Sequence, residues 1–503
     1  MIISSNMKPE SLYKNTVFSL IFTVIIGLLA FLINRVFSDQ LGQENLGLLR
    51  LFSQLVAYLS IAELGVNAAA IAILFKPLQR NDYKKVSSVL FTVDYFYKRI
   101  AFLIFSLGLL LNFGLPFLIE NVNSDVYLYW SLYVISTAIT YLFAKYPILL
   151  SADQRYGFVQ TVRSLLKISM NLAQIFSLFY FKSFYLFVCL ILLSNFIEWM
   201  VFVRFYKIHY RNLIHQNLVK NTELITKTKQ VFVHRLAGVL IFNTDYLIIT
   251  KFVGLNAVAI YSSYLLILQF VQLLINNVAQ VVTPKVGAFY ATNSIDKVKE
   301  LWKKIYSLNC YIATIIVSIL YVMLIDIVEL WMGSEYLIPS LLLWLLLVNL
   351  YIEISRKTLD LIITVSGYYK YMHLPILEGG VNLIASLILV QYFGVVGVVL
   401  GTVISNVVII VFWKPILVLS HVIGVGYLDY LKELLKHVLF LFGSISLISQ
   451  YNSTGNVFFD LAIVTGLAIV VVTFIYLLEK NFRLLILVFM KKQKYIFNTA
   501  PKK

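Results

Sequence analysis

Charged residues are scarce in this chain. Only 13% of its 503 residues are charged, whereas 60% are hydrophobic and the mean hydropathy is +0.86. This composition excludes a soluble protein of this length. The two cysteines, Cys189 and Cys310, both lie within apolar segments. Neither a disulfide framework nor a metal site is therefore expected.

Nucleotide-binding and catalytic motifs are also missing. The sequence has no P-loop, no G-x-S-x-G and no Gly-rich dinucleotide fingerprint. Its six histidines never pair at metal-ligand spacing. These absences argue against a single-chain pump driven by ATP, and we expect neither an enzyme nor a resident cofactor.

What the chain has instead is about fourteen apolar segments, most of them near the roughly 20 residues that an α-helix needs to cross about 30 Å of hydrocarbon. The first covers residues 16–37 and the last residues 457–478. We therefore predict an all-α, polytopic membrane protein with about fourteen transmembrane helices. Residues 430–449 form the weakest segment, because Lys432, Glu433 and Lys436 crowd its start.

The basic residues predict the orientation of these helices. The chain has 41 Lys and Arg against 24 Asp and Glu, a formal net charge of +17. If the apolar segments cross a membrane, the gaps between them alternate between its two sides. Nearly all of the bases lie in or beside the gaps on the side that holds both termini. The gaps on the other side hold only Lys182 and Lys251. Because basic loops resist translocation, both termini are predicted to be cytoplasmic. The charge also favours contact with anionic membrane lipids, whereas no inner loop is long enough to form a nucleic-acid-binding domain.

Short sequence matches recur along the chain at a nearly constant offset. Residues 41–48 resemble residues 253–260, which lie 212 positions later, and the pairs Asn171-Leu172 and Ser194-Asn195 recur 211 positions later. An even number of segments separates the copies, so the halves should share one orientation and be related by a pseudo-twofold axis along the membrane normal. We predict two six-helix bundles that face each other across a cleft, followed by two extra C-terminal helices.

This organisation predicts five regions of the chain. They are residues 1–205 for the first bundle, 206–230 for a cytoplasmic linker, 231–416 for the second bundle, 417–480 for an amphipathic linker with helices 13 and 14, and 481–503 for a basic cytoplasmic tail. In the fourth region, residues 421–437 carry leucines on one side and are expected to lie along the inner membrane surface. Two like-oriented halves without a nucleotide site indicate a secondary transporter that works by alternating access.

Two stretches of the sequence resemble a known family. Residues 41–86, which begin LGQENLGLLRLF, resemble the start of the polysaccharide-biosynthesis flippases, the Wzx-like branch of the multidrug/oligosaccharidyl-lipid/polysaccharide (MOP) exporter superfamily. Residues 243–264, NTDYLIITKFVGLNAVAIYSSY, resemble the seventh-span motif of the same family. The resemblance implies a bacterial plasma-membrane flippase that moves undecaprenyl-diphosphate-linked oligosaccharide from the inner to the outer leaflet. Its product would serve capsule, O-antigen or similar glycan assembly, alongside a glycan polymerase and glycosyltransferases.

The task implied by this resemblance suggests which intramembrane polar residues bind substrate. A diphosphate attracts cations and a sugar chain needs hydrogen bonds, so the cleft should be cationic and rich in amides. Lys145 and Arg356, 211 positions apart, are the best candidates for a phosphate clamp, with snorkelling to the inner interface as the alternative. The weaker basic candidates are Arg235, Arg163 and Lys167.

A second group of candidates consists of amides on one face of a predicted helix. Spacings of three and four place them together, which suits a sugar-lined cavity or, as the alternative, hydrogen bonds between helices. They are Gln269, Gln272, Asn276 and Gln280.

Acidic residues within the spans are candidates for coupling transport to a proton or sodium gradient. Glu63 lies near the centre of the second segment, where an unpaired charge costs at least roughly 2.5 kcal/mol. The alternatives for Glu63 are an ion pair or a permanently protonated acid. Asp245 and Glu353 are further candidates, although Asp245 suits a structural helix contact equally well. Glu353 and Glu378 are also the expected partners of Arg356 and neighbouring bases.

Two other functions remain open. A multidrug exporter of the same superfamily would typically have twelve spans and an acid-rich cavity, which the extra spans and the basic excess here disfavour. A membrane glycan polymerase or glycosyltransferase needs a sizeable outer catalytic loop, and the outer gaps of this sequence are short.

Overall fold

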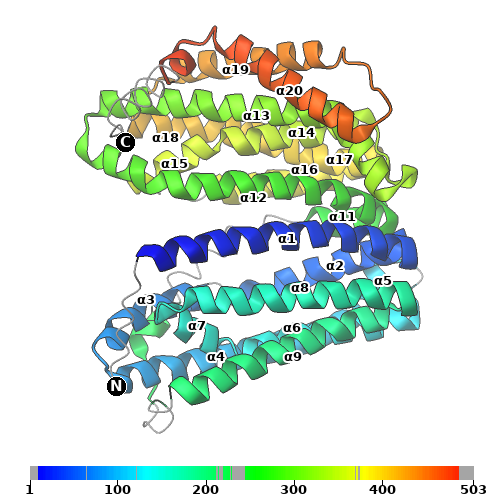
Figure 1. Cartoon of the computed structure of the whole chain (residues 1–503), viewed down its shortest axis with the longest axis vertical. Helices are drawn as coiled ribbons and strands as arrows, with labels where there is room; N and C mark the ends of the chain where they lie inside the picture. Colours follow the sequence, from blue (N-terminus) through cyan, green and yellow to red (C-terminus); the bar gives the residue numbers. More distant parts are fainter. Residues whose placement is uncertain are drawn as a thin grey trace, which may run out of the picture. The chain divides into compact units, whose positions relative to one another are not determined.

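The computed structural model describes residues 9–63, 65–120, 122–210, 213, 219–226, 228, 244–368, 370–371 and 374–485. These residues form α-helices joined by short connections, with no strand among them (Figure 1). The predicted all-α class is therefore confirmed. Two compact units divide the chain, Met1–Ser262 and Ser263–Lys503. The predicted domain boundaries, which assign residues 231–262 to the second bundle, stay a prediction.

Unit 1 contains long antiparallel helices and several short ones. In chain order they are α1 (Pro9–Leu41), α2 (Gln43–Leu59), η1 (Ser60–Glu63), α3 (Val66–Gln79), α4 (Tyr83–Leu110), η2 (Leu111–Phe113), α5 (Leu115–Leu118), α6 (Ser124–Leu142), α7 (Lys145–Ala152), α8 (Tyr156–Phe181), α9 (Phe184–His209) and α11 (Asp245–Phe252). Helix α1 packs on α8, and α6 packs on α4 and α9. Their buried faces form a core that includes Val93, Ile104 and Phe202.

Unit 2 is built from the second half of the helices. They are most of α12 (Leu255–Thr292), then α13 (Ile295–Met332), η4 (Ser334–Tyr336), α14 (Ser340–Ser355), α15 (Lys357–Ser366), α16 (Leu374–Phe393), α17 (Val395–Ser405), the π-helix η5 (Asn406–Trp413), α18 (Lys414–Val422), α19 (Tyr427–Ile448) and α20 (Val457–Tyr476). Helix α13 packs against α14, α19 and α20, and α16 packs closely on α17. Trp302, Cys310 and Tyr476 are buried in this core.

Nine helices among the described residues are long and apolar enough to cross a membrane, or ten if α6 and α7 count as one broken span. The chain is thus a multi-pass membrane protein. Several predicted spans are not single helices: the second divides into α2, η1 and α3, and the tenth into α14 and α15. Most of the predicted seventh span, residues 231–250, lies outside the described residues. The count of about fourteen spans therefore stays a prediction.

Helix starts recur with the spacing of the sequence repeat. Gln43 begins α2 and Leu255 begins α12, 212 positions later, and the same spacing separates Tyr83 of α4 from Ile295 of α13. Helices α9 and α17 begin at Phe184 and Val395, 211 positions apart. The repeat seen in a few residue pairs thus extends to the boundaries of whole helices.

The segment 421–437, expected to be a surface helix, is not one separate helix, and its position along the membrane surface stays a prediction. Helix α18 runs through Val422, and α19 continues without interruption from Tyr427 to Ile448. The reason lies in the partners of the polar residues at its start. Lys436 forms ion pairs with Glu433 and with Glu479 beyond α20, so these charges are satisfied inside unit 2.

Candidate functional site

Two cationic side chains of unit 1, those of Arg50 and Lys167, interact electrostatically. Arg50 on α2 donates a hydrogen bond to the side-chain oxygen of Asn34 on α1. Asn34 is 2% exposed, so this contact fixes the guanidinium in a largely buried position. Lys167 on α8 is close enough to Arg50 for the two positive charges to repel each other.

Neither member of this Arg50–Lys167 pair has a carboxylate within ion-pair distance in the described part of the chain. The Nε atom of Arg50 is buried and bonds to none of the described residues, whereas the Lys167 side chain is exposed. A partly buried cation such as Arg50 within an apolar helix bundle is costly unless an anion accompanies it. The sequence pointed to Lys167 as a weaker candidate, but it missed Arg50.

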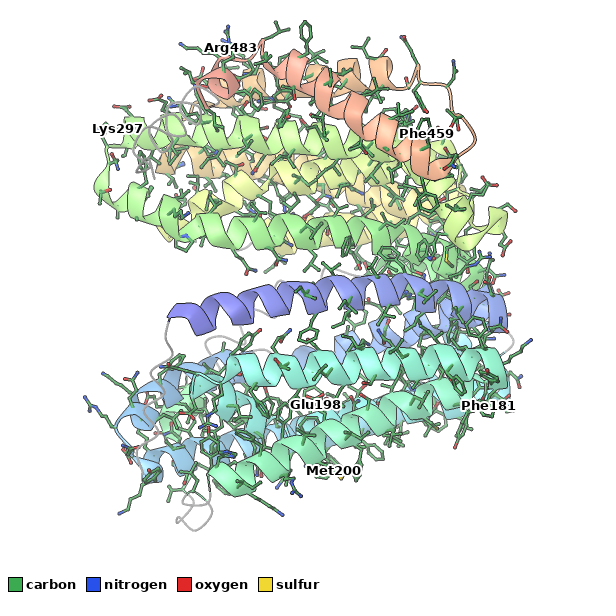
Figure 2. The ribbon with its side chains drawn as sticks, in the orientation of Figure 1. Phe181, Glu198, Met200, Lys297, Phe459 and Arg483 are labelled. Carbon is green, nitrogen blue, oxygen red and sulfur yellow. The ribbon has the colours of Figure 1, made fainter. Side chains whose placement is uncertain are left out.

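The other bases predicted for unit 1 are engaged with acids or lie outside the described residues. Arg163 Nε on α8 lies 2.9 Å from Glu198 Oε1 on α9, and Figure 2 labels Glu198 beside α8. Lys145 Nζ at the start of α7 lies 2.9 Å from Asp94 Oδ1 on α4. Arg235 falls outside the described residues. Phosphate binding by Arg163 or Lys145 therefore requires the phosphate to replace a carboxylate.

Arg356 lies at the break between α14 and α15 and is surrounded by acids. Its guanidinium contacts Glu353 at 3.1 Å, Asp360 at 3.6 Å and Glu378 at 3.7 Å. Lys414 contacts Asp360 at 2.8 Å. The predicted partners of Arg356, Glu353 and Glu378, are thus confirmed. In this cluster the carboxylates of Glu353, Asp360 and Glu378 outnumber the two bases Arg356 and Lys414. The cluster therefore has no excess positive charge that would attract an anion.

The repeat places Lys145 and Arg356 at corresponding helix breaks. Helix α6 ends at Leu142 and α7 begins at Lys145, with a bend of 43° between them. Helix α14 ends at Ser355, one residue before Arg356. Broken helices expose backbone groups and are common where transporters bind substrates or ions. Each of the two bases therefore lies where its helix is interrupted.

The four predicted amides share one face of α12, in its portion within unit 2. Gln269 and Gln280 are exposed, and Gln272 and Asn276 are partly buried. Within the described residues, none of these amides forms a hydrogen bond. Their donors and acceptors are therefore available to an external hydroxyl-rich ligand.

The acidic candidates of unit 1 contact tyrosines. Glu63 ends the short helix η1, and the Tyr97 hydroxyl donates to its Oε1 over 3.4 Å. Asp245 lies in the first turn of α11, where the Tyr261 hydroxyl donates to its Oδ2 over 3.0 Å. In the described chain, Glu63 has no base within ion-pair distance. Glu63 thus contacts phenols rather than a base among the described residues, and its role in ion coupling stays a prediction.

Comparison with known proteins places this geometry in context. None of the curated proteins that were searched matches the chain. Among solved structures, the lipid II flippase MurJ in an inward closed conformation aligns with a TM-score of 0.68 at 14% identity, over 91% of this chain and 98% of that one. An inward-facing multidrug resistance MATE family transporter of the MOP superfamily aligns at 0.61 and 15% identity, over 84% and 99%.

A MOP superfamily transporter from Pyrococcus furiosus, described as having a binding pocket of reverse polarity, aligns at 0.51 and 15% identity, over 80% of this chain and 94% of that one. At such low identity these likenesses show a shared fold. The model of one family, "Polysaccharide biosynthesis protein", matches residues 12–289. Because this match covers more than half of the chain, the protein belongs to the polysaccharide biosynthesis protein family and has the fold of MOP-superfamily transporters.

Proposed function

We propose that this protein flips an undecaprenyl-diphosphate-linked oligosaccharide from the inner to the outer leaflet of a bacterial plasma membrane. The Arg50–Lys167 pair is the observation that carries this proposal. Two neighbouring cations without a carboxylate partner suit a diphosphate, which accepts charge-assisted hydrogen bonds from both. The amides on α12 supply hydrogen bonds of the kind that a sugar chain requires. The family membership supports a glycan-related substrate.

Transport in this proposal follows alternating access and draws on a proton or sodium gradient, with no resident cofactor. Glu63 is the first candidate for the coupling site, and Asp245 and Glu353 are the others. Glycosyltransferases that build the oligosaccharide and a polymerase that consumes it are the proposed partners. Both termini are proposed to lie in the cytoplasm.

The proposal is tested by flipping of a fluorescent undecaprenyl-diphosphate oligosaccharide in proteoliposomes. We expect Arg50→Gln and Lys167→Gln each to slow flipping at least about tenfold, since each removes a charge-assisted hydrogen bond to phosphate. Lys251→Gln, which removes an exposed base on α11, is the matched control and should flip at the wild-type rate. Wild-type rates in both site variants would remove the basis of the proposal.

Export of organic cations is the alternative that the shared fold leaves open. The Arg50–Lys167 pair, which has no carboxylate partner among the described residues, repels such substrates, so we expect no drug transport by the same vesicles. Neutralising Arg50 would then increase cation export if the protein were an exporter, and leave it absent if the protein is a lipid flippase.

A further inference from the structure

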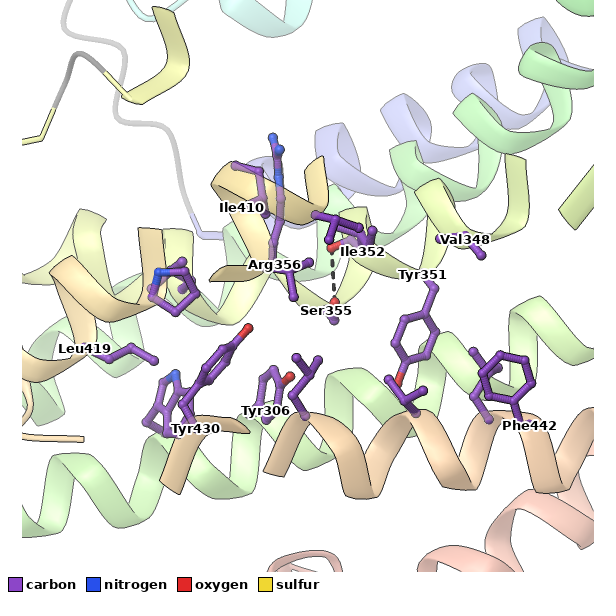
Figure 3. Close-up of a pocket in the computed structure, with 18 of the residues that line it drawn as sticks. Tyr306, Val348, Tyr351, Ile352, Ser355, Arg356, Ile410, Leu419, Tyr430 and Phe442 are labelled. Atoms are coloured by element: carbon purple, nitrogen blue, oxygen red, sulfur yellow. Dashed lines mark hydrogen bonds between the residues drawn. The ribbon is translucent and has the colours of Figure 1, made fainter. Parts of the chain in front are cut away.

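Unit 2 contains a cavity of about 250 Å³ whose lining includes neither the Arg50–Lys167 pair nor the amides of α12. It lies among α13, α14, η5, α18 and α19, and its wall is almost entirely apolar (Figure 3). An apolar cavity of about 150 Å³ already accommodates a benzene molecule. Six aromatic side chains line it: Trp302, Tyr306, Trp344, Tyr351, Tyr430 and Phe442.

The cavity is long and narrow. Its lining on α19 extends from Tyr430 to Phe442, and at 1.5 Å per residue this distance is about 18 Å. Aromatic pairs mark the two ends. Trp302 and Tyr306 stack with centroids 5.2 Å apart, and Tyr306 lies near Tyr430. At the other end, the tilted rings of Trp344 and Phe442 lie 6.1 Å apart. A volume of about 250 Å³ spread over that length fits one hydrocarbon chain better than a compact ring system.

Besides the ion-paired Arg356, two polar groups in the wall, the Trp302 indole N–H and the Tyr351 hydroxyl, are buried without a hydrogen-bond partner among the described residues. Trp302 is 2% exposed, and its indole Nε1 is buried without a hydrogen-bond acceptor in the described part of the chain. A buried donor of this kind normally has an acceptor in the native state. A plain hydrocarbon would leave the indole N–H of Trp302 without an acceptor. An acyl ester has a carbonyl oxygen at the head of its chain, and this oxygen can accept the hydrogen bond. The cavity therefore favours an ester-linked chain.

Among the described residues that line the cavity, Arg356 is the charged one. Three carboxylates balance its charge. The rest of the wall therefore suits an uncharged chain.

We propose that unit 2 binds a phospholipid molecule, with one acyl chain in the cavity and the ester carbonyl accepting a hydrogen bond from Trp302 Nε1. The head group lies beyond the Trp302 end of the cavity, on the side of the membrane that the basic residues assign to the cytoplasm. This lipid is a resident ligand, distinct from the transported molecule. Its acyl chain fills the space between α19 and the other helices that line the cavity. Its binding does not depend on the proposed flipping of oligosaccharide.

Photolabelling in proteoliposomes tests the occupant. A phosphatidylglycerol with a diazirine in one acyl chain should form adducts on the cavity residues of α14 and α19, detected by mass spectrometry of peptides. Val438→Trp fills the cavity and should reduce these adducts at least about fivefold. Leu439→Trp is the matched control, because Leu439 is the next residue of α19 but is 69% exposed. Undiminished labelling of the Val438→Trp variant would overturn the proposal.

A second comparison tests the hydrogen bond without filling the cavity. An ester-linked photolipid should bind the wild-type protein about fivefold more tightly than its ether analogue. This ratio corresponds to the net contribution of one hydrogen bond to the binding free energy. Trp302→Phe should bind the two lipids equally. Equal binding by the wild type would refute the role of Trp302. Displacement of the photolipid by undecaprenyl diphosphate at equal concentration would assign the cavity to the transported lipid instead.

Discussion

Lys145 and Asp94 form an ion pair, with 2.9 Å between Nζ and Oδ1, that ties the start of α7 to the middle of α4. Asp94 also holds Lys98, one turn further along α4, at 2.7 Å. One carboxylate thus balances two ammonium groups, and a positive charge remains at the break between α6 and α7. The corresponding break in unit 2, at Arg356, has the opposite balance.

The prediction that Lys145 and Arg356 contact the head group therefore requires the phosphate to displace a carboxylate from each base. We expect the double variant Lys145→Gln/Arg356→Gln to flip substrate at least about tenfold more slowly than either single variant, because each base can supply charge-assisted hydrogen bonds. Flipping in proteoliposomes is the measurement, with membrane insertion checked separately. Lys98→Gln is the matched control at the same carboxylate. Unchanged flipping by the double variant would mean that both bases serve only their ion pairs.

A second prediction concerns the close contact between α16 and α17. A Cβ atom at Gly397 would lie 2.2 Å from the backbone oxygen of Leu389, so the helices would have to separate. We expect Gly397→Ala to lower the stability of the protein by about 1–3 kcal/mol, measured as thermal unfolding in detergent. Gly380→Ala on α16 is the control. A Cβ atom there meets no atom within 4 Å, so stability should be unchanged or slightly higher.

A third prediction follows from the ionisation of Glu479, just beyond α20. Burial would raise its pKa, but hydrogen bonds from Lys436, the Phe482 backbone and Ser307 outweigh it and lower the pKa from 4.5 to about 2. Because the folded-state pKa is depressed, the ionised group stabilises the fold above about pH 4.5. This stabilisation is lost as the pH falls from there towards 2.

The Glu479→Gln variant should therefore be less stable than the wild type at neutral pH, and the difference should shrink below pH 4.5. Thermal unfolding of α19 and α20, followed over this pH range, is the measurement. Asp429→Asn, at an exposed position in the first turn of α19, is the control that should keep the wild-type pH dependence. Parallel stability curves for Glu479→Gln and the wild type would contradict the prediction.

A fourth prediction tests the orientation in the membrane. In a background with Cys189 and Cys310 replaced by Ala, a cysteine at Asn123 or Asn452 should react with an impermeant thiol reagent added outside intact cells. A cysteine at Thr222 should react only after the cells are opened. All three positions are exposed, so accessibility within the fold does not decide the result. The reverse labelling pattern would invert the proposed topology.

Much of this fold is predictable from the sequence because helix formation in a membrane depends mainly on the local run of apolar residues. Long apolar segments become helices whatever their neighbours are, and the repeat offset predicts where corresponding helices begin. The breaks are harder to foresee. Residues 143–144 are Phe and Ala, neither of which ordinarily interrupts a helix, and the π-helix η5 arises within a uniformly apolar run. These features depend on packing between distant segments.

The candidate site shows the same limit. Arg50 stands out in the sequence as a base within an apolar segment, but its meaning depends on Asn34 and Lys167, which lie on other helices. Likewise, the sequence predicted carboxylate partners for Arg356, but only the fold shows that Lys145 is paired with Asp94. Proximity between residues far apart in the chain decides which charges remain available to a ligand.

The last prediction is that Glu63 couples transport to an ion gradient. Glu63 ends η1, the break between α2 and α3, and its described partner is the hydroxyl of Tyr97 at 3.4 Å. A carboxylate held by a phenol, without a base among the described residues, can bind and release a proton or a sodium ion. Such sites at helix breaks are common in secondary transporters. Glu63→Gln imitates the protonated acid with little change in shape.

We expect Glu63→Gln to fold normally but to lose most of the acceleration that a pH or sodium gradient gives to flipping. Glu63→Asp should keep part of it. Tyr97→Phe retains the ring and the carboxylate, so it should shift the pH dependence of transport without abolishing it. Initial rates in reconstituted vesicles, with and without an imposed gradient, distinguish these outcomes. If Glu63→Gln responds to the gradient like the wild type, Glu63 is a structural residue, and coupling belongs to Asp245 or to Glu353 in the cluster around Arg356.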